Sequence, residues 1–385
     1  MDFELNEDQR AFADTAQQFA DECLAPMAAE WDEKQIFPKD VLREAGGNWG
    51  GFSVSTLQKR KVALSRLDAS IIFEQLSMGC TSTTAFMTIH NMVSWMIASF
   101  SNEEVRAKYC SKLVSGEWLG SYCLTEPNAG SDAASLTTTA SKKGDTYVLN
   151  GGKTFISGAG ETDVLVVMAR TGGEAGAKGV SAFVVPAHAD GISYGRKEPK
   201  MGWNSQPTRA VTFENVVIPA SHLLGEEGQG FVFAMKGLDG GRINIATCSV
   251  GTAQQALERA ARYIQERKQF GKSLAQFQAL QFKLADMATE LVAARQLVRY
   301  AASKLDRNDP DATAYCAMAK RFATDVGFQV CDQALQLYGG YGYIKEYPME
   351  RHFRDVRVHQ ILEGTNEIMR LIIARRLLSE ESALL

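Results

Sequence analysis

The sequence predicts an α+β fold in which a β-rich middle region lies between two helical regions. Helical spacing of apolar residues fills the first third, short β-branched runs fill the middle, and long stretches without glycine or proline fill the last third. A chain of 385 residues suits two or three domains and can bury a substantial core. We place the domain boundaries at 1–118, 119–230 and 231–385.

The N-terminal region is predicted to be helical throughout. Apolar residues recur at three- and four-residue spacing over 7–30, which indicates an amphipathic helix. Residues 66–99 are rich in helix-compatible apolar residues and are interrupted near 79–81. A charged helix is expected over 103–113, with Gly116 ending it.

In the middle region, β-branched runs alternate with turn residues at intervals too short for intervening helices. This pattern predicts a small antiparallel sheet or barrel. The expected strands contain residues 147–149, 164–168, 180–185 and 210–213.

The C-terminal region is predicted to form long helices. No glycine or proline interrupts 272–309, and at ~1.5 Å per residue such a helix would approach roughly 50 Å. A second segment, 312–338, contains only Gly327 as an interruption. Helices of this length are typical of a bundle.

Composition excludes several classes of function. The net charge of −4 provides no basic field for nucleic acid or an anionic membrane, and no apolar run is long enough to span a bilayer. The seven cysteines include no CxxC pair and the five histidines have no metal-binding spacing, so we predict neither disulfides nor a metal site. The first residues lack the features of a signal or transit peptide. We expect a protein of the bacterial cytoplasm, or of the mitochondrial matrix in a mature eukaryotic form.

Glu363 is the candidate catalytic residue. It lies in HQILEGTNEIMR (359–370), where two apolar residues precede it, a glycine follows it and a helix is expected to start at Thr365. An acid in apolar surroundings has a raised pKa, which suits a proton-abstracting base. The alternative is an exposed loop glutamate beside a helix cap, and these residues alone leave both open.

Three further motifs have both structural and ligand-binding interpretations. SYCLTEPNAGSD (121–132) is either a turn between domains or a clamp of amides and hydroxyls for a flat heteroaromatic ring. FIS (155–157) offers an aromatic face to the same ring, although an aromatic residue in a strand is more often part of the core. GEEGQG (225–230) is glycine-rich but has no βαβ context, so we exclude a Rossmann-type site there.

Basic and glycine-rich motifs follow in the last third. RKQFG (267–271) and QLYGGYG (336–342) are either plain helix ends or a phosphate site, in which Arg267 would bind and the paired glycines would allow close backbone approach. Asp239 and Arg242 flank two glycines in an apolar context, so they are expected to pair with each other or to meet a polar ligand.

In this order and at these separations, the motifs resemble those of acyl-CoA dehydrogenases over essentially the whole chain. The resemblance is carried by YCLTEPNAGSD (122–132), FIS (155–157), RKQFG (267–271), QLYGGYGY (336–343) and HQILEGTNEIMRLIIARR (359–376). Within the family, the chain is most similar to the branch that oxidises isobutyryl-CoA. That closer similarity rests on SRLDASIIFE (65–74), CTSTTAFMTIHNM (80–92), GWNSQPTRA (202–210) and GGRINIATCS (240–249).

The resemblance implies the acyl-CoA dehydrogenase fold, with a C-terminal four-helix bundle, FAD as cofactor and a homotetrameric assembly. It implies that Glu363 removes the α-proton of an acyl-CoA while the β-hydrogen leaves as hydride to flavin N5. The expected reaction is isobutyryl-CoA to methacrylyl-CoA, a step of valine catabolism, with an electron-transfer flavoprotein as acceptor. Alternatives are a 2-methylbutyryl- or short straight-chain acyl-CoA dehydrogenase, an oxidase that reduces oxygen, and a non-catalytic flavin or acyl-CoA binding subunit. Residues 86–92 would line the acyl pocket.

The resemblance also implies which residues form the sites. The expected FAD contacts are Tyr122, Cys123, Leu124, Thr125, Ser131, Phe155, Ile156, Ser157, Arg267, Phe270, Phe277, Gln278, Gln336, Leu337, Tyr338, Gly339, Gly340, Thr365, Asn366 and Glu367. The expected acyl-CoA contacts are Ser131, Asp239, Gly240, Gly241, Arg242 and Arg375. The chain departs from the family pattern at 53–63, SVSTLQKRKVA, where a basic run replaces an acidic, glycine-rich stretch. A short charge run of this kind usually lies on a solvated face.

Overall fold

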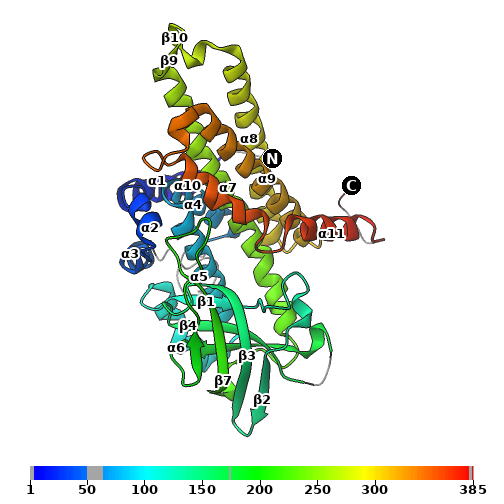
Figure 1. The fold of residues 1–385 in the computed structure, drawn as a ribbon. Coiled ribbons are helices and arrows are strands. Elements are labelled where there is room, and N and C mark those ends of the chain that lie inside the picture. Colours follow the sequence, from blue (N-terminus) through cyan, green and yellow to red (C-terminus); the bar gives the residue numbers. More distant parts are fainter. Residues whose placement is uncertain (1–3, 50–63, 173–174, 381–383, 385) are drawn as a thin grey trace.

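The computed structural model describes residues 4–49, 64–172, 175–380 and 384. Helices come first, strands occupy the middle of the chain, and long helices follow, which is the predicted order (Figure 1). The β-domain forms one end of the molecule, and the longest helices extend toward the other. The unusual basic stretch at 53–63 lies outside the described residues.

The N-terminal helices follow the predicted pattern, with one interruption that the sequence analysis missed. They are α1 (Glu7–Phe19), a π-helix η1 (Ala20–Leu24), α2 (Ala28–Lys34), α3 (Lys39–Trp49), α4 (Arg66–Gly79), α5 (Thr81–Phe100) and α6 (Glu103–Val114). The expected break after α4 is confirmed, because Cys80 is extended, with φ −153° and ψ 106°. The predicted helix over 7–30 is instead divided by the π-helical turn at 20–24.

The middle of the chain forms one eight-stranded sheet. Its strands are β1 (Gly120–Cys123), β2 (Thr139–Lys143), β3 (Thr146–Ser157), β4 (Val164–Arg170), β5 (Val180–Pro186), β6 (Ile192–Tyr194), β7 (Thr208–Pro219) and β8 (Leu223–Leu224). The order is β6-β7-β3-β2-β4-β5-β8, and β1 pairs with β4. The expectation of a purely antiparallel sheet is wrong at two places, because β1 and β2 both run parallel to β4. The parallel pairing of β1 with β4 is possible because β1 enters the sheet directly from the helical region, without a hairpin.

The C-terminal region is built on three long helices. Its elements are α7 (Gly230–Glu266), β9 (Lys268–Gln269), β10 (Lys272–Ser273), α8 (Gln278–Asp306), α9 (Ala312–Tyr338), α10 (Met349–Arg357) and α11 (Asn366–Leu377). The bundle core is rich in buried alanine, which lets the helices approach closely. The helix predicted over 272–309 starts only at Gln278, because residues 268–273 form a two-stranded hairpin whose turn, Phe270-Gly271, has positive φ at both positions.

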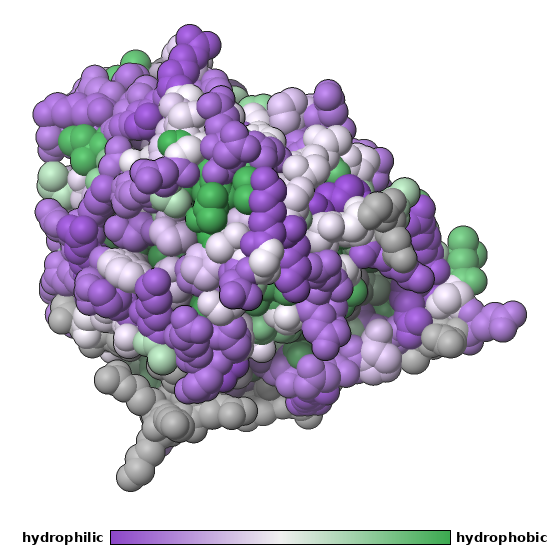
Figure 2. Space-filling model, turned by 90° about the horizontal axis from the view of Figure 1, so that it is seen from below, coloured by the Kyte–Doolittle hydropathy of each residue, from purple (hydrophilic) through white to green (hydrophobic). Residues whose placement is uncertain are grey.

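The surface at the β-domain end is largely hydrophilic, with only small hydrophobic groups between polar side chains (Figure 2). Among the described residues, no helix has the length and apolar character needed to cross a membrane. The described residues also contain no group of three or more histidine, cysteine or acidic side chains arranged to hold a metal ion.

Candidate active site

Glu363 lies in a tight loop between two helical elements. The loop follows the 3₁₀ turn η7 (Val358–Gln360) and precedes α11, where Thr365 caps the helix by accepting a hydrogen bond from Ile368 N at 3.4 Å. The helix start predicted at Thr365 is therefore confirmed. Glu363 has φ +55° and Gly364 has φ +89°, so two successive residues adopt left-handed backbone conformations. This conformation turns the Glu363 side chain back toward the bundle.

The Glu363 carboxylate packs against the backbone of α7 at Gly241. A β-carbon at position 241 would clash with Glu363 Oε2 and would lie 2.9 Å from its Cδ. Oε2 is inaccessible to solvent and has no hydrogen-bond partner among the described residues. A buried carboxylate oxygen without a partner is costly and is found mainly where a ligand or a reaction needs it.

The electrostatic setting of Glu363 suits a base. Burial raises its pKa from the ordinary value of 4.5 to about 7, although Arg242 and Lys320 both act to lower it. Tyr122, on β1, is close enough for the Glu363 charge to raise its pKa further above the ordinary range, in addition to the effect of burial. The Tyr122 hydroxyl is also buried and without a partner in the described part of the chain. Two buried oxygens from different domains therefore share one region.

The paired charges on α7 form as the sequence predicts. Arg242 Nη1 donates to Asp239 Oδ1 at 2.6 Å, and Thr313 Oγ1 donates to Asp239 Oδ2 at 2.7 Å. Arg242 Nε is buried and has no partner among the described residues. The arginine thus keeps one donor available, while its charge faces the Glu363 carboxylate.

The two sequence segments expected to face a flat ring lie side by side. Ser121 Oγ donates to Ser157 O at 2.7 Å, and Thr154 N donates to Thr125 O at 2.9 Å, so the ends of β1 and β3 are joined. The ladder between β3 and β7 shifts register just before Ile156.

That irregularity in β3 exposes one aromatic ring. Phe155, in the register shift, has φ +58° and is 68% exposed. Its ring is available to a ligand instead of forming part of the core.

A buried ion pair supports this region, and the sequence analysis did not identify it. Lys153 Nζ contacts Glu126 Oε1 at 2.7 Å and Leu124 O at 3.1 Å, and both charged side chains are almost fully buried. Burial alone would raise the pKa of Glu126, but Lys153 and hydrogen bonds from Thr138 and Thr137 lower it to about 2. The only available signal was a lysine inside an apolar strand near an acidic turn, which is not specific.

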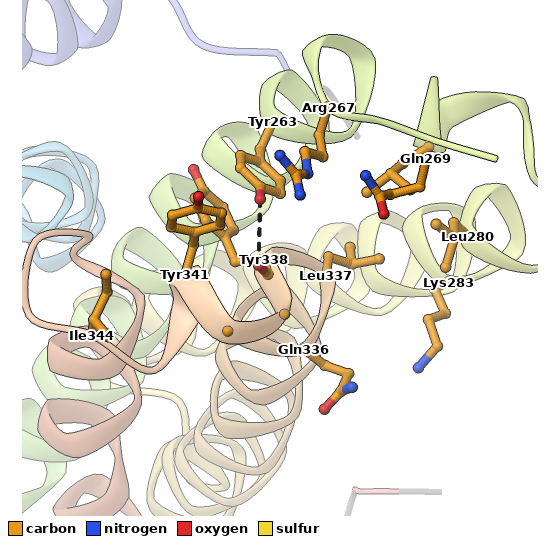
Figure 3. A pocket seen from close by; sticks show the side chains of 13 residues that line it. Tyr263, Arg267, Gln269, Leu280, Lys283, Gln336, Leu337, Tyr338, Tyr341 and Ile344 are labelled. Carbon is orange, nitrogen blue, oxygen red and sulfur yellow. Dashed lines mark hydrogen bonds between the residues drawn. The ribbon is translucent and has the colours of Figure 1, made fainter. Parts of the chain in front are cut away.

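A cavity of about 620 Å³ lies where α7 ends and α9 ends (Figure 3). Tyr263 and Tyr338 stack with ring centroids 4.1 Å apart, and the Arg267 guanidinium lies 5.6 Å from the centre of the Tyr341 ring. The cavity is lined by Tyr263, Arg267, Gln269, Leu274, Leu280, Lys283, Gln336, Leu337, Tyr338, Gly339, Gly340, Tyr341 and Ile344. Six of these are predicted cofactor contacts: Arg267 and the run 336–340.

Five further predicted residues fall into two groups. Phe270 and Phe277 lie at the nearby hairpin with ring centroids 6.2 Å apart, and Gln278 begins α8 beside them. Ser131 and Arg375 are exposed, the first after the turn that follows β1 and the second on α11. Among the described residues, the cavity has no lining from the Glu363 loop or from 122–131. One chain therefore presents two separate sets of predicted contacts.

Comparison with known proteins agrees with this organisation. Models of the N-terminal, middle and C-terminal domains of acyl-CoA dehydrogenases match residues 6–117, 121–216 and 228–378. The chain is 54% identical to the mitochondrial isobutyryl-CoA dehydrogenase of Bos taurus over 98% of its own length and 90% of that protein. It is 53% identical to the mitochondrial isobutyryl-CoA dehydrogenase of Dictyostelium discoideum, over 98% of this chain and 91% of that protein. The solved butyryl-CoA dehydrogenase of Megasphaera elsdenii superposes with a TM-score of 0.95 at 39% identity, covering 98% of this chain and all of that one. The chain belongs to the acyl-CoA dehydrogenase family.

Proposed function

We propose that the protein is an FAD-dependent dehydrogenase that converts isobutyryl-CoA to methacrylyl-CoA, a step of valine catabolism. The observation that carries the chemistry is the Glu363 carboxylate: its Oε2 is buried and has no hydrogen-bond partner among the described residues, and burial raises its pKa to about 7. The choice of acyl group rests on similarity. Identity is 53–54% to two isobutyryl-CoA dehydrogenases but 39% to a short-chain-specific acyl-CoA dehydrogenase of Clostridium acetobutylicum.

In this proposal Glu363 removes the α-proton of the thioester. A pKa near 7 lets the carboxylate be ionised at physiological pH and still accept a proton readily. The developing negative charge spreads to the thioester oxygen, where the backbone N–H of Glu363 would donate together with a ribityl hydroxyl. The packing of the carboxylate against Gly241 fixes the direction from which the proton is taken.

The residues present fit FAD. The joined ends of β1 and β3 would hold the flavin ring, with Tyr122 to Thr125, Ser131 and Phe155 to Ser157 around it. In the cavity at Arg267 and 336–340, a tyrosine ring would pack against the adenine and the guanidinium would bind the pyrophosphate. Thr365, Asn366 and Glu367 would close the site. When bound, the flavin supplies a hydride acceptor for the hydrogen on the β-carbon.

The acyl-CoA contacts are proposed at two positions of different character. Ser131 and Arg375 are exposed and would meet the CoA portion. The Asp239–Arg242 pair and the glycines between its members are buried beside Glu363 and would shape the acyl end. Buried Phe86 and Met92 on α5 would form the wall that limits chain length.

The assembly and its partners are part of the same proposal. The domains would divide at 118 and 230, between α6 and β1 and at the start of α7. A homotetramer would bring the hairpin at Phe270, which is 92% exposed, to the FAD of a neighbouring subunit and so join the two sets of contacts. An electron-transfer flavoprotein would accept the electrons. The mitochondrial relatives favour the matrix as the location for a eukaryotic form, and the bacterial cytoplasm is the counterpart.

The direct test of the catalytic assignment is flavin bleaching under anaerobic conditions. Isobutyryl-CoA added without an external acceptor should reduce the flavin of the wild type stoichiometrically. Glu363→Gln should keep FAD but lose reduction by orders of magnitude, whereas Glu346→Gln, at an exposed position before α10, should behave as the wild type. Undiminished bleaching by Glu363→Gln would refute the assignment.

The same titration separates the alternatives. A series of isobutyryl-, 2-methylbutyryl- and butyryl-CoA measures acyl preference, and one methylene is worth only about 1–3 kcal/mol, so graded preference is expected. Stoichiometric hydrogen peroxide in air would identify an oxidase. A flavin that never bleaches in the wild type would identify a non-catalytic binding subunit.

A further inference from the structure

Lys320 is a buried cation in the middle of the bundle. It lies on α9, and its side chain is 0% exposed. No carboxylate of the described residues lies within ion-pair distance of its ammonium group, in contrast to Lys153, which has Glu126. A buried ammonium without an acid at ion-pair distance opposes folding, because hydrogen bonds and more distant charges offset only part of its lost hydration. Its retention therefore points to a role outside core packing.

The hydrogen bonds of Lys320 all go to the segment that follows Glu363. Its Nζ donates to Gly364 O at 2.7 Å and to Asn366 Oδ1 at 2.9 Å. Asn366 is itself fixed, because its Nδ2 donates to Asp325 Oδ1 at 2.7 Å and to Thr324 Oγ1 at 3.0 Å on the same helix. One side chain of α9 thus holds the loop at the residue after the carboxylate and at the first residue of α11.

This anchorage acts where the backbone is strained. Glu363 and Gly364 both have positive φ, and a non-glycine residue adopts such a conformation only when its surroundings hold it there. Gly241 limits the carboxylate from one side, and the bond from Lys320 to Gly364 O fixes the loop from the other. The two contacts together define where the carboxylate can be.

Lys320 also places positive charge near that carboxylate. The groups that face Glu363 come from three elements: Arg242 on α7, Lys320 on α9 and Tyr122 on β1. The groups that face Lys320 are Glu363, Arg242, Asp325 and Glu367. Burial lowers the pKa of Lys320 to about 7, although Glu363, Asp325 and Glu367 act to raise it.

We propose that Lys320 is a positioning residue for the α-proton abstraction, holding the Glu363–Gly364 loop through Gly364 O and Asn366 and favouring the ionised carboxylate. This inference rests on the proposed function, in which Glu363 is the base. It does not give Lys320 any contact with substrate or cofactor.

The test uses the FAD-loaded protein and the rate of anaerobic flavin reduction by isobutyryl-CoA between pH 6 and pH 9. Lys320→Met removes both the charge and the donor, Lys320→Gln keeps a donor without charge, and Lys320→Arg keeps the charge. Lys304→Met, at a surface ion pair with Asp309 on the same bundle, is the matched control. The substrate concentration for half-maximal rate is measured in each case.

The expected result is a shift in the pH profile as well as a loss of rate. In the Lys320→Met and Lys320→Gln variants the pKa of Glu363 should rise. The rising limb of the plot of flavin-reduction rate against pH should therefore move to higher pH. A displacement of one pH unit corresponds to a roughly tenfold lower rate at a fixed pH below the limb. Lys320→Gln should be faster than Lys320→Met at pH 9, and Lys320→Arg, which stays charged throughout this range, should keep the rising limb at the wild-type pH or move it to lower pH. The substrate concentration for half-maximal rate should change little. Lys304→Met should match the wild type in both rate and pH profile.

Other outcomes overturn the inference. An unmoved limb in folded, FAD-loaded Lys320→Met and Lys320→Gln would exclude the electrostatic role, and equal maximal rates would exclude the anchoring role. Failure of all three variants to give a folded, FAD-loaded protein would assign Lys320 to core packing alone. An error in the assignment of Glu363 as the base would be recognised separately, because isobutyryl-CoA would then still reduce the flavin of the Glu363→Gln variant.

Discussion

Gly241 and Glu363 are packed so closely that any side chain at position 241 would displace the Glu363 carboxylate. The glycine lies in the interior of α7, more than 120 residues before the acid, and a β-carbon there would lie 2.9 Å from Glu363 Cδ. The position of the Glu363 carboxylate is therefore set partly by the absence of a side chain at residue 241.

Gly241→Ala is expected to separate stability from activity. Alanine in a helix interior favours the helix by roughly 0.5–1 kcal/mol relative to glycine, so the helix itself should tolerate the change. The displaced carboxylate should lower the rate of flavin reduction by roughly 100-fold, the scale of a 1 Å misplacement. Stopped-flow reduction and thermal unfolding measure the two effects. Gly47→Ala, at a glycine inside α3, is the control, since its β-carbon would meet nothing within 4 Å; equal rates in both variants would contradict the argument.

Replacement of Glu363 by glutamine should stabilise the protein at alkaline pH. Burial raises the pKa of Glu363 to about 7, so the folded state holds this proton more tightly than the unfolded chain does. The resulting stability is fully present below pH 4.5 and is lost as the pH rises through 7. Glu363→Gln avoids that loss, so its free energy of unfolding should exceed that of the wild type by roughly 2–3 kcal/mol at pH 8. Urea unfolding of the FAD-free protein at pH 5 and pH 8 measures it, and a pH-independent difference would count against a buried acid.

The Glu126–Lys153 pair should be essential to the stability of the region where β1 and β3 end, which is proposed to hold the flavin. Lys153→Met leaves the Glu126 carboxylate buried without its cation, which costs about 3–5 kcal/mol. The pKa of Glu126 is lowered to about 2, so this stabilisation is present above its ordinary pKa and is lost as the pH falls toward 2. At pH 7, both the free energy of unfolding measured in urea and the amount of FAD retained should decrease in this variant. The double variant Glu126→Gln/Lys153→Met should recover much of the loss, and a double variant no better than the single one would show that the charge is not the cause.

Phe270 is expected to support assembly and not the fold of the single chain. It is 92% exposed at the tip of the β9–β10 hairpin, where a neighbouring subunit would cover it. Phe270→Ser should shift sedimentation from tetramer toward smaller species and reduce bound FAD, with helix content unchanged. Val217→Ser, at a 58% exposed position on β7, should leave the tetramer intact. If neither substitution changes the sedimentation of the tetramer, the subunit interface lies elsewhere.

Local signals in the sequence were sufficient for much of the fold. The break at Cys80 and the helix start at Thr365 were predicted correctly, because capping and interruption are decided by a few neighbouring residues. The start of α8 was predicted too early. Residues 272–277 contain no glycine or proline, so no local signal indicated that the hairpin turning at Phe270-Gly271 continues into them. The parallel pairing of β1 with β4 depends on where a distant strand lies, so no local pattern could predict it.

The candidate site shows the same division. The apolar residues before Glu363 correctly predicted a raised pKa, and the charges on either side of the α7 glycines correctly predicted a pair. The roles of Gly241 and Lys320 could not be found in this way, because each acts on the loop from another helix. Their contacts arise only when α7, α9 and the loop before α11 are packed together.

Because Glu363 and Gly364 both adopt left-handed backbone conformations, the connection between η7 and α11 reverses within a few residues and contains no spare residue. Adding or deleting one residue there would move the Glu363 carboxylate away from Gly241, whereas changes to the side chains proposed to line the acyl pocket would leave the turn intact. Relatives that adapt this scaffold to other acyl groups are therefore expected to vary in pocket side chains and to keep the length of this connection.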